Sequence, residues 1–228
     1  MPHPESMAVE RSIRASIVAA ARQMLDEGLV AGTAGNVSAR RPNSSTFWIT
    51  PSGVSFTALT RAQLVAIDLD GKRVRGRLEP SSDTMNHAAI YRRRPDVGAV
   101  VHTHSPHATV FAVLHRPIPA LLAEAAGYLG GEVPVMAYLP PANPHLGERA
   151  ADGLGSHRAV LLANHGVIAV GETLDTAVTT ARLVEHSARI AFMAMTIGEP
   201  KPLPGDEVER LHAFLHTEYG QRARKRVD

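Results

Sequence analysis

The sequence contains no cysteine among its 228 residues, and this absence limits the chemistry open to it. Disulfides, thiolate nucleophiles and thiolate metal ligands are excluded, so any metal site must use histidine and carboxylate. Aromatic residues are also scarce, at 4%. Aliphatic side chains must therefore fill the core, and a hydrophobic share of 44% over this length suffices for one large domain.

Long apolar runs and a strong charge of one sign are also missing. No stretch approaches the ~18 apolar residues of a membrane helix, and the first residues lack the pattern of a signal peptide. The formal net charge is +2, from 24 basic and 22 acidic residues. Basic clusters at 92–94 and 222–226 carry no interleaved aromatics, so we interpret them as solvated surface. We expect a cytoplasmic protein that binds neither nucleic acid nor membrane.

Strand and helix patterns are mixed along the chain without strict alternation. Asp70-Gly71 between two short apolar runs predicts a hairpin. Apolar periodicity and capping signals predict seven helices. They are expected at 6–27, between Pro80 and Pro95, at 107–114, within 120–131, from after Pro144 to about 154, at 173–197 and at 207–219. Strands are predicted at 46–50, 64–69, 73–74, 97–101, 133–138, 159–163 and 167–170. We expect an α/β (α+β) fold with one domain over 1–228, built on a central, mostly antiparallel sheet flanked by helices on both faces.

A glycine-containing stretch, AGTAGNVSAR at 31–40, follows the first predicted helix. Gly32 and Gly35 permit a tight turn, and Asn36 and Ser38 supply polar groups. Backbone N–H groups in such a loop bind anions. An ordinary turn from a helix into a strand explains the pattern equally well, so both interpretations remain open.

The strongest chemical signal lies within residues 79–107. His102 and His104 directly follow the predicted strand at 97–101 and are two positions apart, so on an extended backbone their rings share one face. Asp83 adds a carboxylate, and His165, which follows a later apolar strand, adds a third imidazole. Three imidazoles and a carboxylate suit zinc or another borderline divalent metal. A polar ring at the end of a buried strand also needs a partner, and a metal supplies one.

A chance grouping of histidines is the alternative to a metal site, because the chain has twelve of them. Ser82 or Asp83 also suits a helix N-cap, although a helix N-terminus that binds phosphate is compatible with that interpretation. His87, one helical turn after Asp83, either orients a ligand or serves packing. We interpret the remaining histidines as surface or supporting groups: His107, His115, His157, His186, His212 and His216.

Five short motifs, GTAGNVS, TPSG, PSSD, HTH and NHG, occur in an order and spacing that resemble the class II sugar-phosphate aldolase/epimerase superfamily. Its members include L-fuculose-phosphate aldolases, L-ribulose-5-phosphate 4-epimerases and the non-enzymatic adducin head domain. The resemblance covers about residues 11–219 and leaves a basic tail at 220–228. It implies a four-fold homotetramer with active sites between subunits.

The resemblance also assigns roles by position. It implies that His102, His104 and His165 bind a divalent metal, Zn²⁺ or alternatively Mn²⁺ or Co²⁺. It makes Asp83 a metal ligand or an acid/base group, and Tyr219 a proton donor. Phosphate-binding positions of the family match Asn36, Ser52, Gly53, Ser81 and Ser82.

The sequence departs from both enzyme prototypes. Asp83 resembles the epimerases, because the fuculose-type aldolases carry Glu there. Gly127, however, stands where the epimerases have a second catalytic Asp, and Ala123 stands where the aldolases have a catalytic Tyr. Glu124 and Tyr128 lie nearby as candidate substitutes.

We favour a metal-dependent aldolase that cleaves a small phosphorylated ketose, with the metal as Lewis acid and the carboxylate moving a proton. A pentulose-phosphate 4-epimerase and a decarboxylase of a 3-keto sugar-acid phosphate use related chemistry and remain alternatives. A non-enzymatic, adducin-like interaction module is an alternative from another class. A metal-dependent hydrolase is less favoured, because the further Asp–His pair or Lys of such enzymes is not recognised.

Overall fold

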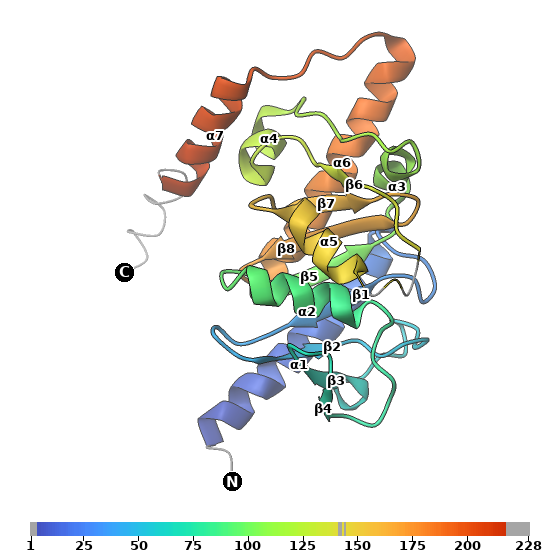
Figure 1. Cartoon of the computed structure of the whole chain (residues 1–228), viewed down its shortest axis with the longest axis vertical. Helices are drawn as coiled ribbons and strands as arrows, with labels where there is room; N and C mark the ends of the chain where they lie inside the picture. The colour runs from blue at the N-terminus through green and yellow to red at the C-terminus, as the bar shows by residue number, and fades with distance from the viewer. Residues whose placement is uncertain (1–3, 141–142, 144, 218–228) are drawn as a thin grey trace.

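An eight-stranded sheet runs through the middle of the protein (Figure 1). The computed structural model describes residues 4–140, 143 and 145–217, and its strand order is β4-β3-β2-β1-β5-β8-β7-β6. Every neighbouring pair is antiparallel except β6 and β7, so the predicted architecture is confirmed. The strands are β1 (Asn36–Ala39), β2 (Thr46–Ile49), β3 (Val65–Asp68), β4 (Arg73–Arg75), β5 (Ala99–Thr103), β6 (Val135–Met136), β7 (Ala159–Leu162) and β8 (Gly166–Gly171).

Helices cover both faces of this sheet. Their bounds are α1 (Pro4–Asp26), α2 (Thr84–Arg93), α3 (Pro106–Val113), α4 (Ala123–Leu129), α5 (Leu146–Leu154), α6 (Leu174–Ile197) and α7 (Gly205–Thr217), with a short 3-10 helix at Arg61–Gln63. Apolar residues of α1, α3, α4 and α6 form a core with one face, and those of α2 and α5 form a second core with the other. Helix α7 packs on α4, away from the sheet (Figure 1).

Strand β5 decides which face receives the histidines. Val101 packs into the core beside α6, whereas Val100 packs into the core beneath α2 and α5. Because side chains alternate along a strand, His102 faces the same side as Val100. The site therefore forms on the face that α2 and α5 cover.

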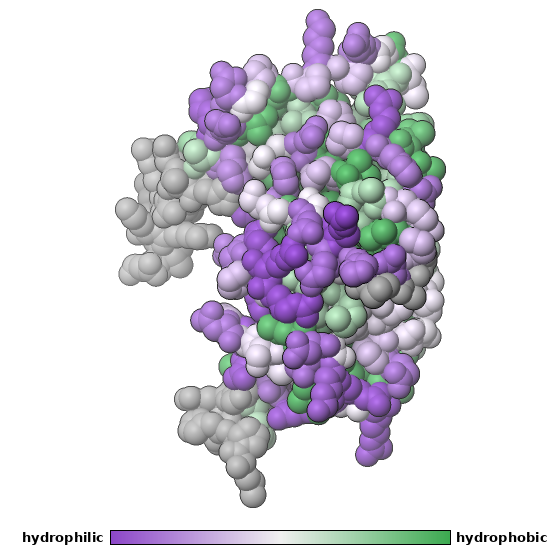
Figure 2. Space-filling model, viewed as in Figure 1, coloured by the Kyte–Doolittle hydropathy of each residue, from purple (hydrophilic) through white to green (hydrophobic). Residues whose placement is uncertain are grey.

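The outer surfaces of α2 and α5 are charged. Arg92 and Arg93 each lie 2.7 Å from a carboxylate oxygen of Glu148, and Arg94 lies 2.7 Å from Asp96. Hydrophilic side chains gather over these two helices in Figure 2. The basic run at 92–94 thus makes ion pairs within the chain.

The first strand of the sheet differs most from the sequence prediction. Residues 36–39 belong to the stretch that we expected to be a loop or a turn, but they form β1, and all four are buried. Two polar residues in a four-residue segment hid the strand pattern. Strand β6 is also shorter than the predicted 133–138, and β5 extends beyond the predicted end to Thr103.

The C-terminal candidates lie beyond the last described helix. Tyr219 and the basic tail at 220–228 are both outside the described residues. Within the described part, every helix is too short or too polar to cross a membrane.

Candidate active site

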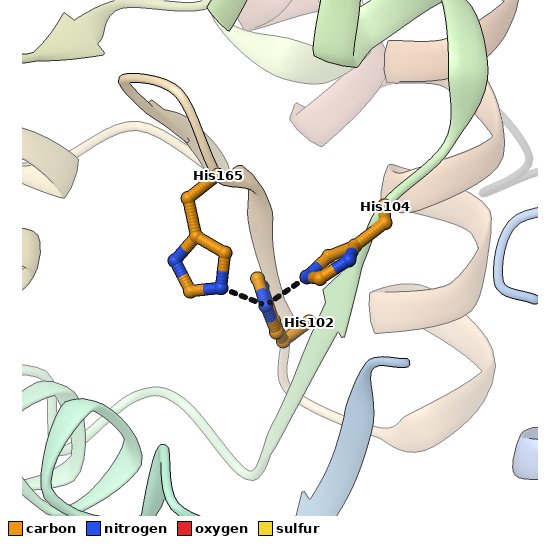
Figure 3. A group of neighbouring side chains, drawn as sticks. All are labelled: His102, His104 and His165. Atoms are coloured by element: carbon orange, nitrogen blue, oxygen red, sulfur yellow. Dashed lines mark hydrogen bonds between the residues drawn. The ribbon is translucent and has the colours of Figure 1, made fainter. Parts of the chain in front are cut away.

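Three histidine rings point toward one another on the α2/α5 face of the sheet (Figure 3). The Nε2 atom of His102 lies 2.9 Å from Nε2 of His104 and 3.2 Å from Nε2 of His165. A tetrahedral zinc ion with Zn–N bonds of about 2.0–2.1 Å places its nitrogens roughly 3.3 Å apart. The two distances from the His102 nitrogen are close to this value, and one nitrogen of each ring lies within 4.8 Å of the other two, so the cluster suits such an ion.

The three rings are positioned by two neighbouring strands, β5 and β8. His102 lies in β5 and His104 just beyond its end, while His165 lies in the tight turn between β7 and β8. Gly166, which starts β8, makes room for the cluster: a Cβ there would lie 2.8 Å from Cδ2 of His104 and 3.3 Å from Cε1 of His102. A larger residue at this position would collide with the rings.

The turn that presents His165 has an unusual backbone. Asn164 adopts a left-handed conformation with φ of 55°, and its N–H donates to the carbonyl oxygen of Ala112 in α3 at 3.2 Å. Its Oδ1 accepts a hydrogen bond from Nε2 of His115 at 2.6 Å. Asn is among the few residues other than Gly that visit this conformation routinely. The sequence motif NHG thus combines a turn residue, a ring and a required glycine.

The protonation of the cluster follows from its surroundings. Nδ1 of His102 lies 2.8 Å from the carbonyl oxygen of Val167, so it carries the proton and leaves the Nε2 lone pair facing the cluster. Burial lowers the pKa of His102 to about 3. Burial and the neighbouring His165 lower the pKa of His104. Both rings are therefore neutral at pH 7, the form in which imidazole binds a metal.

Asp83 lies at the edge of the cluster, with Oδ2 3.8 Å from Nε2 of His102. It occupies the N-cap position of α2, but its side chain makes no capping bond. Instead its carboxylate accepts hydrogen bonds from the side-chain amides of Asn36 at 2.7 Å and Asn86 at 3.2 Å. Burial opposes its charge, yet the neighbouring His102 and the Asn36 bond lower the pKa of Asp83 below its usual value. An ionised carboxylate beside the rings can act as a ligand or a base.

A cavity of about 340 Å³ adjoins the cluster. Its lining includes Asp83, His104 and His165 together with all five sequence-predicted phosphate positions: Asn36, Ser52, Gly53, Ser81 and Ser82. Among the described lining residues none is Arg or Lys. A phosphate in this cavity would rely on hydroxyl groups, backbone N–H groups and the first turn of α2.

The walls of the cavity are tied together by backbone bonds. The N–H of Ser52 donates to the carbonyl of Glu79 at 2.9 Å, and that of Ser81 donates to Thr50 at 3.2 Å. The glycine turn before β1 approaches β5 closely: a Cβ on Gly35, whose φ is 86°, would lie 2.6 Å from the carbonyl oxygen of His102. This stretch is therefore both a turn into a strand and part of the cavity wall.

The residues on α4 do not join this site within one chain. Tyr128 Oη donates to the carbonyl oxygen of Thr176 at 3.4 Å, and a Cβ on Gly171 would touch Thr176. Gly171 ends β8, whereas Gly166 starts it beside the cluster. At ~3.4 Å per residue, the two ends of this strand are roughly 17 Å apart. Tyr128 thus lies near the opposite end of the sheet.

Gly127 also has a structural explanation within the chain. A Cβ there would lie 2.9 Å from Cδ1 of Leu215 and 3.1 Å from Cβ of Leu211, both on α7. His212 Nδ1 donates to its carbonyl oxygen at 2.7 Å. The absence of a side chain at Gly127 lets α7 pack closely on α4.

Three residues that support the site were not predicted from the sequence. Asn86 is one helical turn after Asp83, and this spacing was the available signal for it. His115 and Asn164 lie 49 positions apart, so only the fold brings them together.

The mostly antiparallel sheet and the three converging histidines agree with the class II aldolase resemblance of the sequence. The chain belongs to the family described as class II aldolase and adducin N-terminal domain, whose model matches residues 15–192.

Relatives and solved structures place it among the enzymes of that family. The chain is 41% identical over 212 residues to a 5-methylthioribulose-1-phosphate/5-deoxyribulose-1-phosphate aldolase of Rhodospirillum rubrum, covering 93% of this chain and 94% of the relative. It is 38% identical over 208 residues to a 5-deoxy-D-ribulose 1-phosphate aldolase of Bacillus thuringiensis, covering 91% and 97%. A solved L-fuculose 1-phosphate aldolase superposes with a TM-score of 0.87 at 32% identity, covering 90% of this chain and 96% of that one. The prediction of an enzyme rather than an adducin-like module is confirmed.

Proposed function

We propose that this enzyme is a divalent-metal-dependent aldolase that cleaves a small ketose 1-phosphate by retro-aldol chemistry. The observation that carries the proposal is the convergence of three imidazole nitrogens beside a carboxylate, at the edge of a cavity that all five sequence-predicted phosphate positions line. The names of the relatives support a 5-deoxypentulose 1-phosphate as the first substrate to test.

His102, His104 and His165 would hold Zn²⁺, or alternatively Mn²⁺ or Co²⁺. When bound, such an ion supplies Lewis-acid chemistry, because it stabilises negative charge that develops on substrate oxygens. The remaining contributions come from the chain itself. Asn36, Ser52, Gly53, Ser81 and Ser82 hold the phosphate, and binding energy from this end positions the C3–C4 bond for cleavage.

Proton transfer is assigned to Asp83 and Tyr219. As the C3–C4 bond breaks, the C4 hydroxyl loses a proton and the new aldehyde forms, and C3 of the other fragment must then gain a proton. Asp83 is suited to accept a proton, because it is ionised and faces the cavity. Tyr219 is the proposed donor, on the strength of the family resemblance alone.

We further propose a homotetramer with active sites between subunits. Exposed apolar side chains at the ends of α3 and α6 support an interface there: Val113 is 54% exposed, Leu114 58% and Ile197 89%.

The test is a substrate panel assayed with the metal-loaded enzyme. It includes 5-deoxy-D-ribulose 1-phosphate, L-fuculose 1-phosphate, L-ribulose 5-phosphate and a 3-keto sugar-acid phosphate. Release of dihydroxyacetone phosphate is the readout for an aldolase, and His104→Ala is the control. Release from a ketose 1-phosphate that is lost in His104→Ala is the expected result. Inversion at C4 of ribulose 5-phosphate without release would identify an epimerase, and loss of CO₂ from a keto-acid phosphate would identify a decarboxylase.

Intersubunit sites have a separate test. Mixed assemblies of His104→Ala and Tyr219→Phe chains would regain activity if one chain supplies the metal cluster and another supplies the tyrosine. Mixed assemblies that stay as inactive as either parent would contradict sites shared in this way.

A further inference from the structure

A line of buried hydrogen bonds runs from the interior of the protein to Asp83. Tyr91 Oη lies 2.8 Å from Ser38 Oγ, which lies 2.6 Å from Nδ1 of His87. Nε2 of His87 lies 2.6 Å from Oδ1 of Asn36, whose Nδ2 donates to Asp83 at 2.7 Å. The four residues behind Asp83 are at most 3% exposed.

The direction of every bond in this line follows from its ends. Both carboxylate oxygens of Asp83 accept from side-chain amides, Oδ2 from Asn36 and Oδ1 from Asn86, so Asn36 turns its NH₂ group toward Asp83 and its Oδ1 toward His87. The Asn36 oxygen can only accept as well, so Nε2 of His87 must carry a proton. The His87 ring is completely buried, which disfavours its charged form, so its Nδ1 is unprotonated and accepts from the Ser38 hydroxyl.

The far end of the line is set by Tyr91. The Ser38 hydroxyl donates to His87, so its oxygen accepts from Tyr91. Burial raises the pKa of the Tyr91 phenol, so this hydroxyl keeps its proton. The whole line therefore has one consistent arrangement, Tyr91 to Ser38 to His87 to Asn36 to Asp83.

This arrangement works against the local preference of Asp83. An Asp at the N-cap of a helix normally turns its carboxylate back to accept a backbone N–H of the first turn. Asp83 occupies this position in α2 but makes no such bond. Its Oδ2 is held instead by Asn36, from β1, and faces the histidine cluster.

We propose that His87 is a positioning residue, whose Nε2–H tautomer locks the Asn36 amide so that its NH₂ holds the Asp83 carboxylate toward the reacting groups and away from the helix cap. His87 itself does not line the cavity; it acts through Asn36. The assignment of a role in turnover rests on the proposed function, whereas the tautomer and the amide orientation do not.

Four variants test the role in turnover. His87→Leu removes the donor to Asn36, His87→Gln places an amide NH₂ near the former Nε2, and Ser38→Ala removes the hydroxyl that donates to Nδ1 of His87. Thr180→Val is the matched control. Thr180 lies on α6, on the face of the sheet opposite to the site, and its fully buried hydroxyl donates to the carbonyl oxygen of Val170. The readouts are kcat, KM for the phosphorylated substrate and metal content per chain.

Loss of a residue that orients a reacting group typically costs about 10–100-fold in activity. We expect His87→Leu to lower kcat by this factor while KM and metal content stay within about twofold. The three imidazoles are untouched, and so are the phosphate positions other than Asn36: Ser52, Gly53, Ser81 and Ser82. His87→Gln should recover much of the loss, Ser38→Ala should lie between them, and Thr180→Val should match the unmodified enzyme. If His87→Leu fails to fold, the milder Ser38→Ala carries the test.

Three results would overturn the role in turnover. These are a normal kcat in His87→Leu, a His87→Gln variant no better than His87→Leu, and a fall in kcat matched by an equal loss of metal.

A spectroscopic measurement tests the arrangement without turnover. Nitrogen NMR of ¹⁵N-histidine-labelled, metal-free protein should show a His87 ring protonated at Nε2 and not at Nδ1, with the signal assigned by its loss in His87→Gln. A ring protonated at Nδ1 would overturn the inference. If the enzyme cleaves no sugar phosphate, the proposed function fails while this measurement still decides the arrangement.

Discussion

His102 and His165 are 63 positions apart in the sequence, yet their Nε2 atoms lie 3.2 Å apart. Strands β5 and β8 are antiparallel neighbours, and Thr103 of β5 pairs with Val167 just after the turn that holds His165. The end of one strand and the start of the other therefore meet at a single point on the α2/α5 face. The candidate metal centre therefore lies where two neighbouring central strands of the sheet meet.

Metal content gives the first prediction. The unmodified protein should carry about one divalent ion per chain, and His104→Ala should carry less than a tenth of this amount, measured by elemental analysis. The exposed His186→Ala is the control and should retain the ion. A chelator should lower the melting temperature of the unmodified protein, because an ion that binds only the folded state stabilises it. Equal metal content in both variants would contradict the assignment.

Gly166 gives the second prediction. Gly166→Ala should weaken metal binding and lower activity, since the new Cβ would meet Cδ2 of His104 at 2.8 Å and the carbonyl oxygen of Thr103 at 2.4 Å. Gly198→Ala is the matched control, because a Cβ there meets nothing within 4 Å. Metal titration of both variants measures the effect. An unchanged affinity in Gly166→Ala would show that the rings move aside freely.

Asn164 gives the third prediction, which separates its backbone from its side chain. Asn164→Gly retains the left-handed conformation but loses the bond to His115, whereas Asn164→Val is strained at a φ of 55°. We expect the valine variant to lose roughly 1–3 kcal/mol in free energy of unfolding, and the glycine variant to lose less than ~1 kcal/mol. Urea denaturation of the metal-free proteins measures both. Equal losses would mean that the side-chain bond, not the backbone, matters most.

The pH dependence of stability gives the fourth prediction. The pKa of His87 is about 4 in the folded chain, below its usual value of 6.5. Below pH ~6.5 the unfolded chain binds a proton that the folded chain excludes. The contribution of neutral His87 is therefore complete above pH ~6.5, and falls by up to about 1.4 kcal/mol per pH unit as the pH drops toward 4.

His87→Gln should remove this contribution. Urea unfolding of the metal-free variant between pH 7 and pH 4.5 should show a shallower loss of stability than the unmodified protein. The two proteins should differ by up to about 1.4 kcal/mol per pH unit in slope. Parallel curves would mean that His87 is protonated in the folded state.

The sequence predicted the parts of the fold that depend on local pattern. Strand alternation placed His102 and His104 on one face, and helix periodicity located α1, α2 and α6. β1 was missed because Asn36 and Ser38 are polar and yet buried, at 3% and 0% exposure. Their burial is satisfied by His87, Asp83 and Tyr91, and these partners come from elements that no local pattern connects.

The length of β6 and the position of α4 could not be predicted from the sequence for a related reason. β6 pairs with β7 through two residues only, so flanking strand formers at 133–138 overstated its length. Glu124 and Tyr128 were considered as substitutes for the catalytic groups that the family has near these positions, but within one chain α4 packs on α7 and α6. Contacts between distant elements decided both points.

The pairing of β5 has a consequence for how the protein folds. His102 stands opposite Asn36 of β1 on one side and Ile168 of β8 on the other. A slip of one residue would turn His102 to the opposite face of the sheet, among the apolar side chains beneath α1 and α6. A misaligned chain would then have no converging nitrogens to offer an ion. Binding of an ion would therefore stabilise only chains in which β5 has the correct register. A chain with the wrong register would be metal-free and inactive, not merely less active.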